Sequence, residues 1–359
     1  MPRLALVLVA AFVASPILAG CLTPGATDTA NAPSAAMGAM NVTAPKVDAK
    51  AMLTELKSFA EAFPKRNTDN AAHNGARAYL KAAYEKAGLS NVSFDNLTAQ
   101  NSQGATPTGG SGEVKLVNVC AFHWGTTNPT EWVVVGAHYD VTDGAVYGTY
   151  DDGSGTMIVQ YLARAFAKVP TSRTIVFCNF DGEEQGLRGS THMVKTLLEG
   201  SWIVNNGTVI AEVDFDMAGI NYPAPPPLVA DVVSPEMKAM IAKKAEALKM
   251  PKESIEYRPV TGGSSDNGPF KAANISSVLL ISDFDKVALP VVGVPPGPLA
   301  GQVKYPFWHQ MDTYDGMVQL AGGEDNLVKG TQNVLDIGAD LLANLASDMP
   351  APHFEKNPK

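Results

Sequence analysis

The chain has 359 residues, of which 45% are hydrophobic and 18% charged, with a formal net charge of −9 and a mean hydropathy of −0.01. These values exclude a disordered chain, a collagen-like fibre and a protein with several membrane spans, and the length suits one large α/β domain or two of average size. No dense basic run is present in the sequence, so we expect no nucleic-acid partner.

The N-terminus is predicted to be an export signal. Arg3 precedes an apolar run over 4–13 that is too short for a comfortable membrane span. Leu18-Ala-Gly-Cys21 then resembles the lipobox of prokaryotic lipoproteins, although an ordinary cleaved signal with a nearby cysteine is the alternative. We expect residues 1–20 to be a lipoprotein signal peptide and Cys21 to be lipidated. The protein would then work outside the cytoplasm, held to the outer side of the membrane only by that lipid.

A flexible tether is predicted over 21–47, because this segment is rich in small and polar residues and has too little apolar surface to fold. From Asp48 onward, helix and strand patterns alternate without an internal repeat, which predicts one folded domain over 48–348 and a C-terminal tail over 349–359. The predicted helices are 70–86, capped by Asn70 and closed by Gly88, about 154–168, one that opens at Ser234-Pro235, and about 325–346.

The strand candidates are 114–122, 132–138, 174–180, 209–216 and 277–282. Strands separated by helices predict an α/β fold with a mixed, mostly parallel central sheet and helices on both faces. The short link between the first two strands allows a hairpin, which is the reason to expect a mixed sheet. In such sheets, ligand sites lie at the carboxyl ends of the strands.

Polar residues stand at several of these strand ends. His138 and Asp140 share one face, so Asp140 could orient the His138 imidazole toward a metal, although such a pair is more often structural. Asp151 lies in a glycine-rich turn before a helix. Asp152 or Ser154 could cap that helix, but two successive carboxylates exceed what a cap needs.

Further acids and a histidine complete the set. Glu183 and Glu184 follow another strand, where one could bind a metal and the other act as general base, although a solvated charged turn would look the same. Asp214 and Asp216 share a face at a third strand end, and His309 lies in an aromatic loop. The histidines without such an acidic strand-end setting are His73, His123, His192 and His353. Two histidines and several carboxylates suit one or two zinc ions.

Five segments, taken in order, resemble the secreted and vacuolar di-zinc aminopeptidases. The segments are 136–140, 151–155, 182–190, 216–219 and 308–309. The same clan of zinc exopeptidases (clan MH) includes glutamate carboxypeptidase, transferrin receptor and the glutaminyl cyclases. The resemblance covers about 48–348, and implies that this domain is catalytic and has the zinc-exopeptidase fold.

The resemblance also implies two zinc ions and a role for each residue. Asp151 would bridge the ions, with His138 and Asp216 completing one metal site and Glu184 and His309 the other. Glu183 would be the general base for a hydroxide that bridges the metals, and Asp140 would orient His138. The implied activity is hydrolysis of N-terminal residues from peptides.

Two departures from the family pattern leave alternatives open. Trp308 stands where the aminopeptidases often have Tyr at the oxyanion, and glutaminyl cyclases have Trp in their substrate pocket here. Asn267 stands where the family commonly has His. The uninterrupted segment from Glu183 to Ser190 favours a peptidase over a cyclotransferase. A non-catalytic zinc-binding or peptide-binding lipoprotein is a third candidate, but it would not require Glu183 beside Glu184. Whether Cys120 and Cys178 form a disulfide stays open.

Overall fold

The computed structural model describes residues 39–67, 70–100, 113–204, 206–222, 228–257, 265–282 and 307–356. The folded unit begins at Ala39, so the predicted signal peptide, Cys21 and most of the predicted tether lie outside the described residues. No helix in the described ranges is long and apolar enough to cross a membrane.

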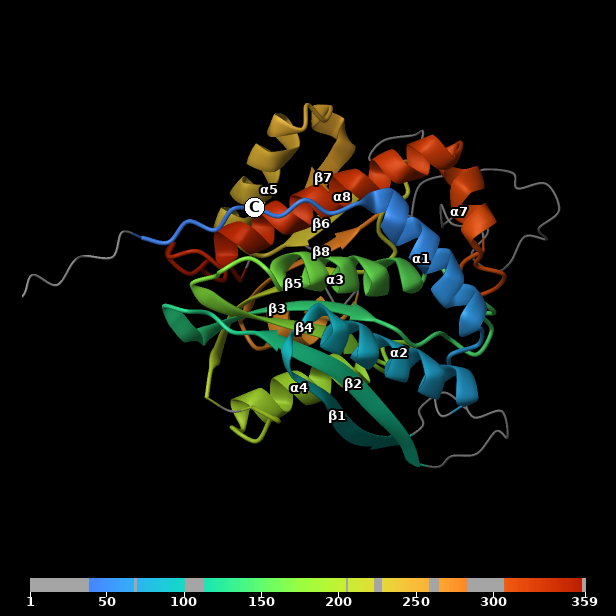
Figure 1. Ribbon diagram of the computed structural model, residues 1–359, viewed down its shortest axis with the longest axis horizontal. Coiled ribbons are helices and arrows are strands. Elements are labelled where there is room, and N and C mark those ends of the chain that lie inside the picture. The colour runs from blue at the N-terminus through green and yellow to red at the C-terminus, as the bar shows by residue number, and fades with distance from the viewer. Residues whose placement is uncertain are drawn as a thin grey trace, which may run out of the picture. The chain divides into compact units, whose positions relative to one another are not determined.

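One mixed β-sheet forms the centre of the described part. Its strands are β1 Ser90–Gln100, β2 Glu113–His123, β3 Asn128–His138, β4 Arg173–Phe180, β5 Thr208–Phe215, β6 Leu228–Val232, β7 Ile255–Tyr257 and β8 Ser276–Ile281. They lie in the order β1-β2-β4-β3-β5-β8-β6-β7 (Figure 1). The central strands β4, β3, β5 and β8 run parallel, whereas β1 with β2, β2 with β4 and β6 with β8 are antiparallel pairs. The expected α/β fold with a mixed, mostly parallel sheet is confirmed.

The predicted hairpin between β2 and β3 is wrong. β4 lies between these two strands, antiparallel to β2 and parallel to β3. Every residue of β4 is buried, which is the pattern of a strand that is paired on both sides and covered on both faces. The short link from β2 to β3 therefore crosses the start of β4 rather than closing a hairpin.

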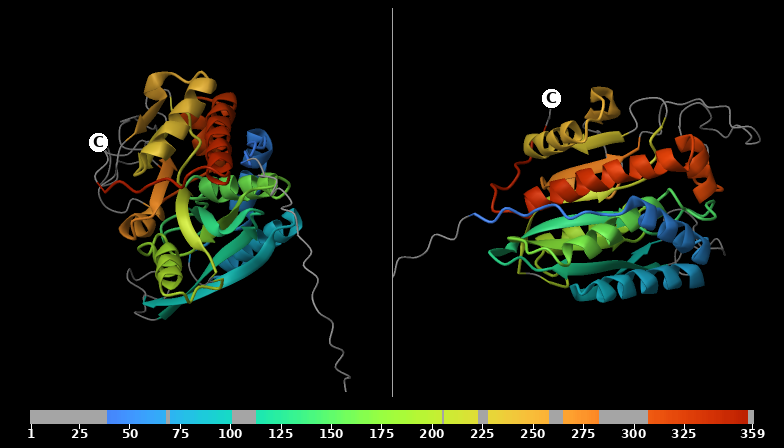
Figure 2. Two further views of the ribbon diagram at one scale, coloured as in Figure 1. Left: turned by 90° about the vertical axis from the view of Figure 1, so that its left-hand side faces the viewer. Right: turned by 45° about the horizontal axis from the view of Figure 1, so that its top comes forward.

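Helices cover both faces of the sheet. They are α1 Ala49–Ala62, α2 Ala71–Ala87, α3 Gly153–Phe166, α4 Arg188–Leu198, α5 Pro235–Ala247, α6 Asn267–Ala272, α7 Tyr314–Ala321 and α8 Glu324–Leu345, with a 3₁₀ turn at Lys252–Ser254. The left view of Figure 2 shows α3 and α8 on one side of the sheet and α4 and α6 on the other. The larger hydrophobic core lies beneath α1, α2, α3, α5 and α8, and a smaller one lies beneath α4 and α6.

The predicted helix ends are set by their capping residues. The Asn70 side chain accepts the backbone N–H of His73, and Gly88 closes α2 in the left-handed conformation at φ 84°. Ser234 caps α5 in the same way, with a proline at the first helical position. Of the two candidate caps for α3, Asp152 is the one whose side chain accepts a backbone N–H from the first turn.

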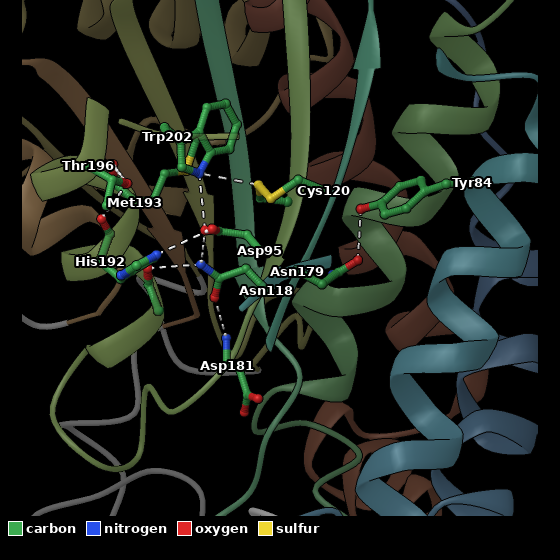
Figure 3. Close-up of a disulfide and its surroundings, with 12 residues drawn as sticks. Tyr84, Asp95, Asn118, Cys120, Asn179, Asp181, His192, Met193, Thr196 and Trp202 are labelled. Carbon is green, nitrogen blue, oxygen red and sulfur yellow. Dashed lines mark hydrogen bonds and ion pairs between the residues drawn. A yellow bond between two sulfur atoms is a disulfide. The ribbon is translucent and has the colours of Figure 1, made fainter. Parts of the chain in front are cut away.

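A disulfide joins the sulfur atoms of Cys120 and Cys178, which answers the pairing question that the sequence leaves open. The two residues are direct cross-strand partners in β2 and β4, and both are fully buried. Figure 3 shows the disulfide close to Met193 of α4 and Trp202. The bridge therefore reinforces the antiparallel pairing on the α4 side of the sheet.

Both ends of the described chain are hydrogen-bonded to the domain, whereas the sequence predicts a flexible tether and a tail there. Within the predicted tether, the Met40 and Val42 N–H groups donate to Asp348 Oδ2 and Ser347 Oγ, each at 2.8 Å. In the predicted tail, Met349 O accepts a hydrogen bond from Arg173 at 2.5 Å. The tether residues hold few apolar side chains, so composition alone placed the boundary at Asp48 instead of Ala39.

Candidate metal centre

Three neighbouring parallel strands bring acidic and histidine side chains to one edge of the sheet. His138 is the last residue of β3, Asp216 follows β5, and Glu184 lies in the turn after β4. Asp151 stands just before α3, and its peptide bond to Asp152 is cis. His309 lies in a turn shortly before α7. All five predicted ligands therefore converge, although they are separated by up to 171 residues along the chain.

The five side chains form two groups of three that share Asp151. In the first group, His138 Nε2 lies 3.3 Å from Asp151 Oδ1 and 3.9 Å from Asp216 Oδ1. In the second group, His309 Nε2 lies 3.3 Å from both Asp151 Oδ2 and Glu184 Oε2. Asp151 thus presents one carboxylate oxygen to each group, which is the arrangement that a ligand shared by two cations requires.

The donor atoms fit divalent cations. Asp216 Oδ1 and Glu184 Oε1 are buried and accept no hydrogen bond from any residue that the structure describes. A buried carboxylate oxygen without a donor is costly, and a cation placed within either group would compensate it. One imidazole nitrogen with two carboxylates per group suits zinc, which binds nitrogen and oxygen ligands and keeps a position open in catalytic sites.

Asp140 connects the two strand ends that carry the site. Its Oδ1 lies 3.4 Å from His138 Nδ1, and its carbonyl oxygen lies 3.2 Å from the same nitrogen. Its carboxylate also accepts the backbone N–H groups of Glu183 at 3.1 Å and Glu184 at 3.3 Å. Contacts of this kind fix the orientation of a ligating imidazole and leave Nε2 directed at the metal.

Burial and mutual charge shift the acid–base behaviour of the ligands. Burial by itself would lower the pKa of His138, but hydrogen bonds with Asp140 and Asp151 outweigh it and raise that pKa well above its usual range. Burial also opposes ionisation of Asp151, yet the two histidines hold its pKa below the usual value. Burial raises the pKa of Asp216 to about 7 and that of Glu183 well above its usual range. Such strongly shifted groups in one cluster are typical of a functional site.

A clasp formed by Asp312 holds the Asp151 turn. Asp312 is fully buried, and its Oδ2 accepts the backbone N–H groups of both Tyr150 and Asp151 at 2.8 Å. Thr149 Oγ1 donates to the Asp312 carbonyl oxygen at 3.0 Å. This clasp joins the segment that carries His309 to the segment that carries Asp151, and sequence reasoning gave Asp312 no role.

The loop between Asp140 and Asp151 is held by Arg66, another residue for which no role is predicted from the sequence. The buried guanidinium donates to the carbonyl oxygens of Tyr139 and Gly148, each at 2.6 Å, and to that of Tyr147. Burial lowers the pKa of Arg66 to about 10, opposed by the nearby carboxylates. Arg66 therefore stays charged at neutral pH and places a positive charge beneath the acidic site.

The remaining predicted residues divide between the site and its surroundings. The Trp308 ring lies against the His309 ring, with centroids 3.8 Å apart, so Trp308 borders the second ligand group. Asp214 is buried but lies outside both groups, and its Oδ2 accepts the backbone N–H of Asn267 at 2.9 Å. The Asn267 side chain donates to Asp231 Oδ2 at 3.0 Å, away from the ligands.

A family model supplies the decisive comparison. The model of peptidase family M28 matches residues 118–320, more than half of the chain, and this range contains all five predicted ligands, Asp140 and Glu183. The chain belongs to peptidase family M28. The resemblance to clan MH zinc exopeptidases is thereby confirmed.

Curated members with similar sequences match over short segments. A probable zinc metalloprotease from Pyrenophora tritici-repentis is 43% identical over 91 residues, which are 23% of this chain and 19% of that protein. Aminopeptidase YwaD from Bacillus subtilis (strain 168) is 33% identical over 152 residues, 42% of this chain and 31% of that protein. This chain therefore matches less than a third of the length of either M28 relative.

Solved structures agree over most of the M28 chain. BSAP, a zinc aminopeptidase from Bacillus subtilis, superimposes with a TM-score of 0.64 at 16% identity, covering 88% of this chain and 100% of that one. A glutaminyl cyclase from an Acidobacteriales bacterium superimposes with a TM-score of 0.60 at 18% identity, covering 84% and 96%. At these identities the likeness establishes a shared fold, and peptidase and cyclase share it equally well.

Proposed function

We propose that this M28 protein is a zinc-dependent aminopeptidase that removes N-terminal residues from peptides. The observation that carries the proposal is the shared Asp151, with one oxygen in each of two histidine–carboxylate groups. Two cations held by one carboxylate, beside a further glutamate, form a hydrolytic centre rather than a structural metal site, which would be closed by its ligands. The aminopeptidase named among the relatives supports the same activity.

The chain's own residues would divide the work. The two groups would hold zinc, which would supply a Lewis acid for the scissile carbonyl and would lower the pKa of the attacking water. Glu183 is held by its N–H bond to Asp140 and is fixed beside the ligand Glu184. Its carboxylate would take a proton from that water and return it to the leaving amine. Its raised pKa suits a group that must both accept and release a proton.

Exopeptidase action would follow from the excess of negative charge. The two groups contain three carboxylates from Asp151, Glu184 and Asp216, and Glu183 adds a fourth nearby. A protonated peptide N-terminus is attracted to such a cluster, and the free amine can occupy an open metal position. A blocked N-terminus offers neither interaction, so acetylated peptides should be poor substrates.

A direct assay tests the proposed activity. The purified protein, loaded with zinc, is incubated with a panel of aminoacyl-nitroanilides and with their N-acetylated counterparts. Release of nitroaniline from the free-amine substrates alone is expected. Glu183→Gln is the matched control, because it keeps the metal ligands and removes the base. Release that persists at the wild-type rate in this variant would contradict the mechanism.

A glutaminyl cyclase activity is the second candidate. It is favoured by Trp308 against His309 and by the cyclase among the similar folds. Peptides with N-terminal glutamine, followed by mass spectrometry, separate the two reactions, because cyclisation releases ammonia and keeps the peptide bond, whereas hydrolysis releases free glutamine. Formation of pyroglutamate without peptide cleavage would replace the aminopeptidase proposal. Stoichiometric zinc binding without either reaction would indicate a binding lipoprotein.

We also propose that the protein is exported and anchored by lipid at Cys21. The Cys120–Cys178 disulfide supports export, because such bonds persist in oxidising compartments. Expression in a bacterial host followed by fractionation should place the wild-type protein with the membranes. Cys21→Ser should release the protein from the membranes without loss of fold. Equal distribution of both proteins would rule out the anchor.

A further inference from the structure

Asp181 is a buried acid at the end of β4 that the proposed mechanism does not use. It lies two residues before Glu183 and is fully buried. Its carboxylate accepts hydrogen bonds from His73 Nε2 at 2.9 Å, from the Val117 N–H at 2.7 Å and from the Tyr139 hydroxyl at 3.1 Å. Donors from α2, β2 and the end of β3 therefore meet on one carboxylate beside the site.

The backbone of Asp181 is fixed as well. Its N–H donates to Asn118 Oδ1 at 3.1 Å, and Asn118 Nδ2 in turn donates to Asp95 Oδ2 and to the Gly189 carbonyl oxygen, each at 3.0 Å. Figure 3 shows this chain of side chains running from Asp181 through Asn118 to Asp95. The start of the turn that carries Glu183 is thus bound to β2 and, through β2, to β1 and the start of α4.

His73 is committed to Asp181. Its ring is fully buried and lies stacked on Tyr139, with centroids 5.1 Å apart and planes 17° apart. Its Nδ1 is buried and has no hydrogen-bond partner among the described residues, so Asp181 receives the hydrogen bond that the side chain makes. The ring is on the β3 side of Asp181, against the residue that separates His138 from Asp140.

Tyr139 transmits this contact to the metal ligands. Its side chain points away from the site, and its hydroxyl donates to the Val117 carbonyl oxygen at 2.9 Å as well as contacting Asp181. Its backbone connects His138, which is a predicted ligand, to Asp140, which contacts His138 and the turn after β4. A shift of Tyr139 would therefore move the ligand and its orienting acid together.

We propose that His73, Asp181 and Tyr139 form a positioning unit, which sets the end of β3 against the turn after β4 and thereby fixes His138 and Glu183 relative to each other. This inference rests on the proposed zinc peptidase function. The unit touches neither metal nor substrate. Its effect would pass through backbone placement. Groups that hydrogen-bond a metal ligand directly commonly change metal affinity or activity by about 10-fold to 100-fold when they are lost, and we expect this unit to act at the lower end of that range.

Zinc binding by the metal-free protein tests the unit independently of catalysis. His73→Phe keeps an aromatic ring but removes the donor to Asp181, and should weaken zinc affinity about tenfold in calorimetric titration. His73→Gln retains a donor at the same reach and should recover most of that loss. Once a substrate has been identified, His73→Phe should lower kcat about tenfold with little change in KM, because the residues that contact the substrate are unchanged.

Tyr84→Phe is the matched control for Tyr139→Phe. Both changes remove one buried hydroxyl that bonds to a residue near the end of β4. Tyr84 bonds to Asn179 within the strand, at 2.7 Å, whereas Tyr139 contacts Asp181 at the start of the turn that carries Glu183. Tyr139→Phe should weaken zinc binding several-fold, and Tyr84→Phe should leave it unchanged while both lower the unfolding temperature. If His73→Phe fails to fold, the comparison of Tyr139→Phe with Tyr84→Phe still tests the proposal.

The outcome that overturns the unit is zinc affinity equal to wild type in both His73→Phe and Tyr139→Phe, since their role would then be structural only. A wild-type protein that binds zinc but cleaves no peptide would refute the proposed function instead. The calorimetric comparison would still decide the positioning unit in that case.

Discussion

The carboxylate of Asp312 accepts the backbone N–H of Asp151 at 2.8 Å, so one buried acid holds in place another that is shared by both metal-ligand groups. Asp312→Ala would leave two buried N–H groups without an acceptor, counting that of Tyr150. Each orphaned group costs about 1–3 kcal/mol, so the free energy of unfolding should fall by about 2–6 kcal/mol. Urea denaturation measures this loss.

The same change should weaken zinc binding, because the Asp151 turn loses its support. Asp312→Asn is the control, since its side-chain oxygen can still accept both N–H groups and should retain most of the affinity. If Asp312→Ala lost stability but bound zinc like Asp312→Asn, the clasp would serve only the fold.

Removal of Arg66 should loosen the loop between Asp140 and Asp151. Arg66→Met leaves three carbonyl oxygens without their donor and removes the positive charge beneath the site. We expect unfolding free energy to fall by about 3–5 kcal/mol, in the range for a broken buried network. Arg66→Lys restores the charge without the planar fork and should recover only part of the loss. Thermal denaturation of the three proteins at neutral pH is sufficient to rank them.

The Glu55 cluster should make the fold sensitive to acid. Glu55 on α1 makes a two-point contact with Arg164 on α3 and also accepts the Tyr161 hydroxyl at 2.8 Å. The Arg164 hydrogen bond is the main reason that the pKa of Glu55 is lowered from 4.5 to about 2. A lowered folded-state pKa gives stability that is complete above about pH 4.5 and is lost as pH falls toward 2.

Glu55→Gln should therefore be less stable than wild type at pH 7 but lose less stability between pH 5 and pH 2.5. Because the pair is partly exposed, we expect wild type to lose only about 1–3 kcal/mol more unfolding free energy than Glu55→Gln over that interval. Urea midpoints at four pH values would measure it. Parallel curves for wild type and Glu55→Gln would show that the cluster holds no such pH-dependent energy.

Loss of the disulfide should reduce stability and leave the metal centre intact. The bridge closes a loop with a sequence separation of 58, for which the loop-entropy estimate is about 4 kcal/mol. The double variant Cys120→Ala, Cys178→Ala should unfold at correspondingly lower urea concentration. Zinc stoichiometry, measured on the folded variant, should be unchanged. A double variant that was as stable as wild type but no longer bound zinc would show that the disulfide supports the metal centre and not the stability of the fold.

Most of the candidate metal centre could be predicted from the sequence because its residues follow strands of strong apolar pattern. The rule that parallel strands bring their carboxyl ends to one edge places His138, Glu184 and Asp216 together. The division of the five residues, His309 included, into two groups around Asp151 needed the family resemblance. Strand order was predicted less well, because a link of a few residues between β2 and β3 resembles a hairpin until β4 is placed.

The residues that support the candidate site could not be predicted from the sequence, because the groups to which they bond leave no local sequence pattern. Arg66 and Asp312 bond mainly to backbone groups, whose presence is the same at every position and leaves no pattern in the sequence. His73 has no acidic strand-end setting in the sequence, and its partner Asp181 lies 108 residues away. Such contacts arise from the packing of α2 against the sheet, which local sequence does not encode.

The bonds that hold residues 40–42 have a consequence for where the N-terminal segment joins the domain. Asp348 accepts the Met40 N–H and also contacts Asn128, the first residue of β3, whereas His138 at the other end of that strand borders the metal centre. Eleven residues of β-strand span about 35 Å, so Asn128 and His138 lie at opposite ends of β3. The first described residues are therefore attached to the domain about one strand length away from the candidate metal centre.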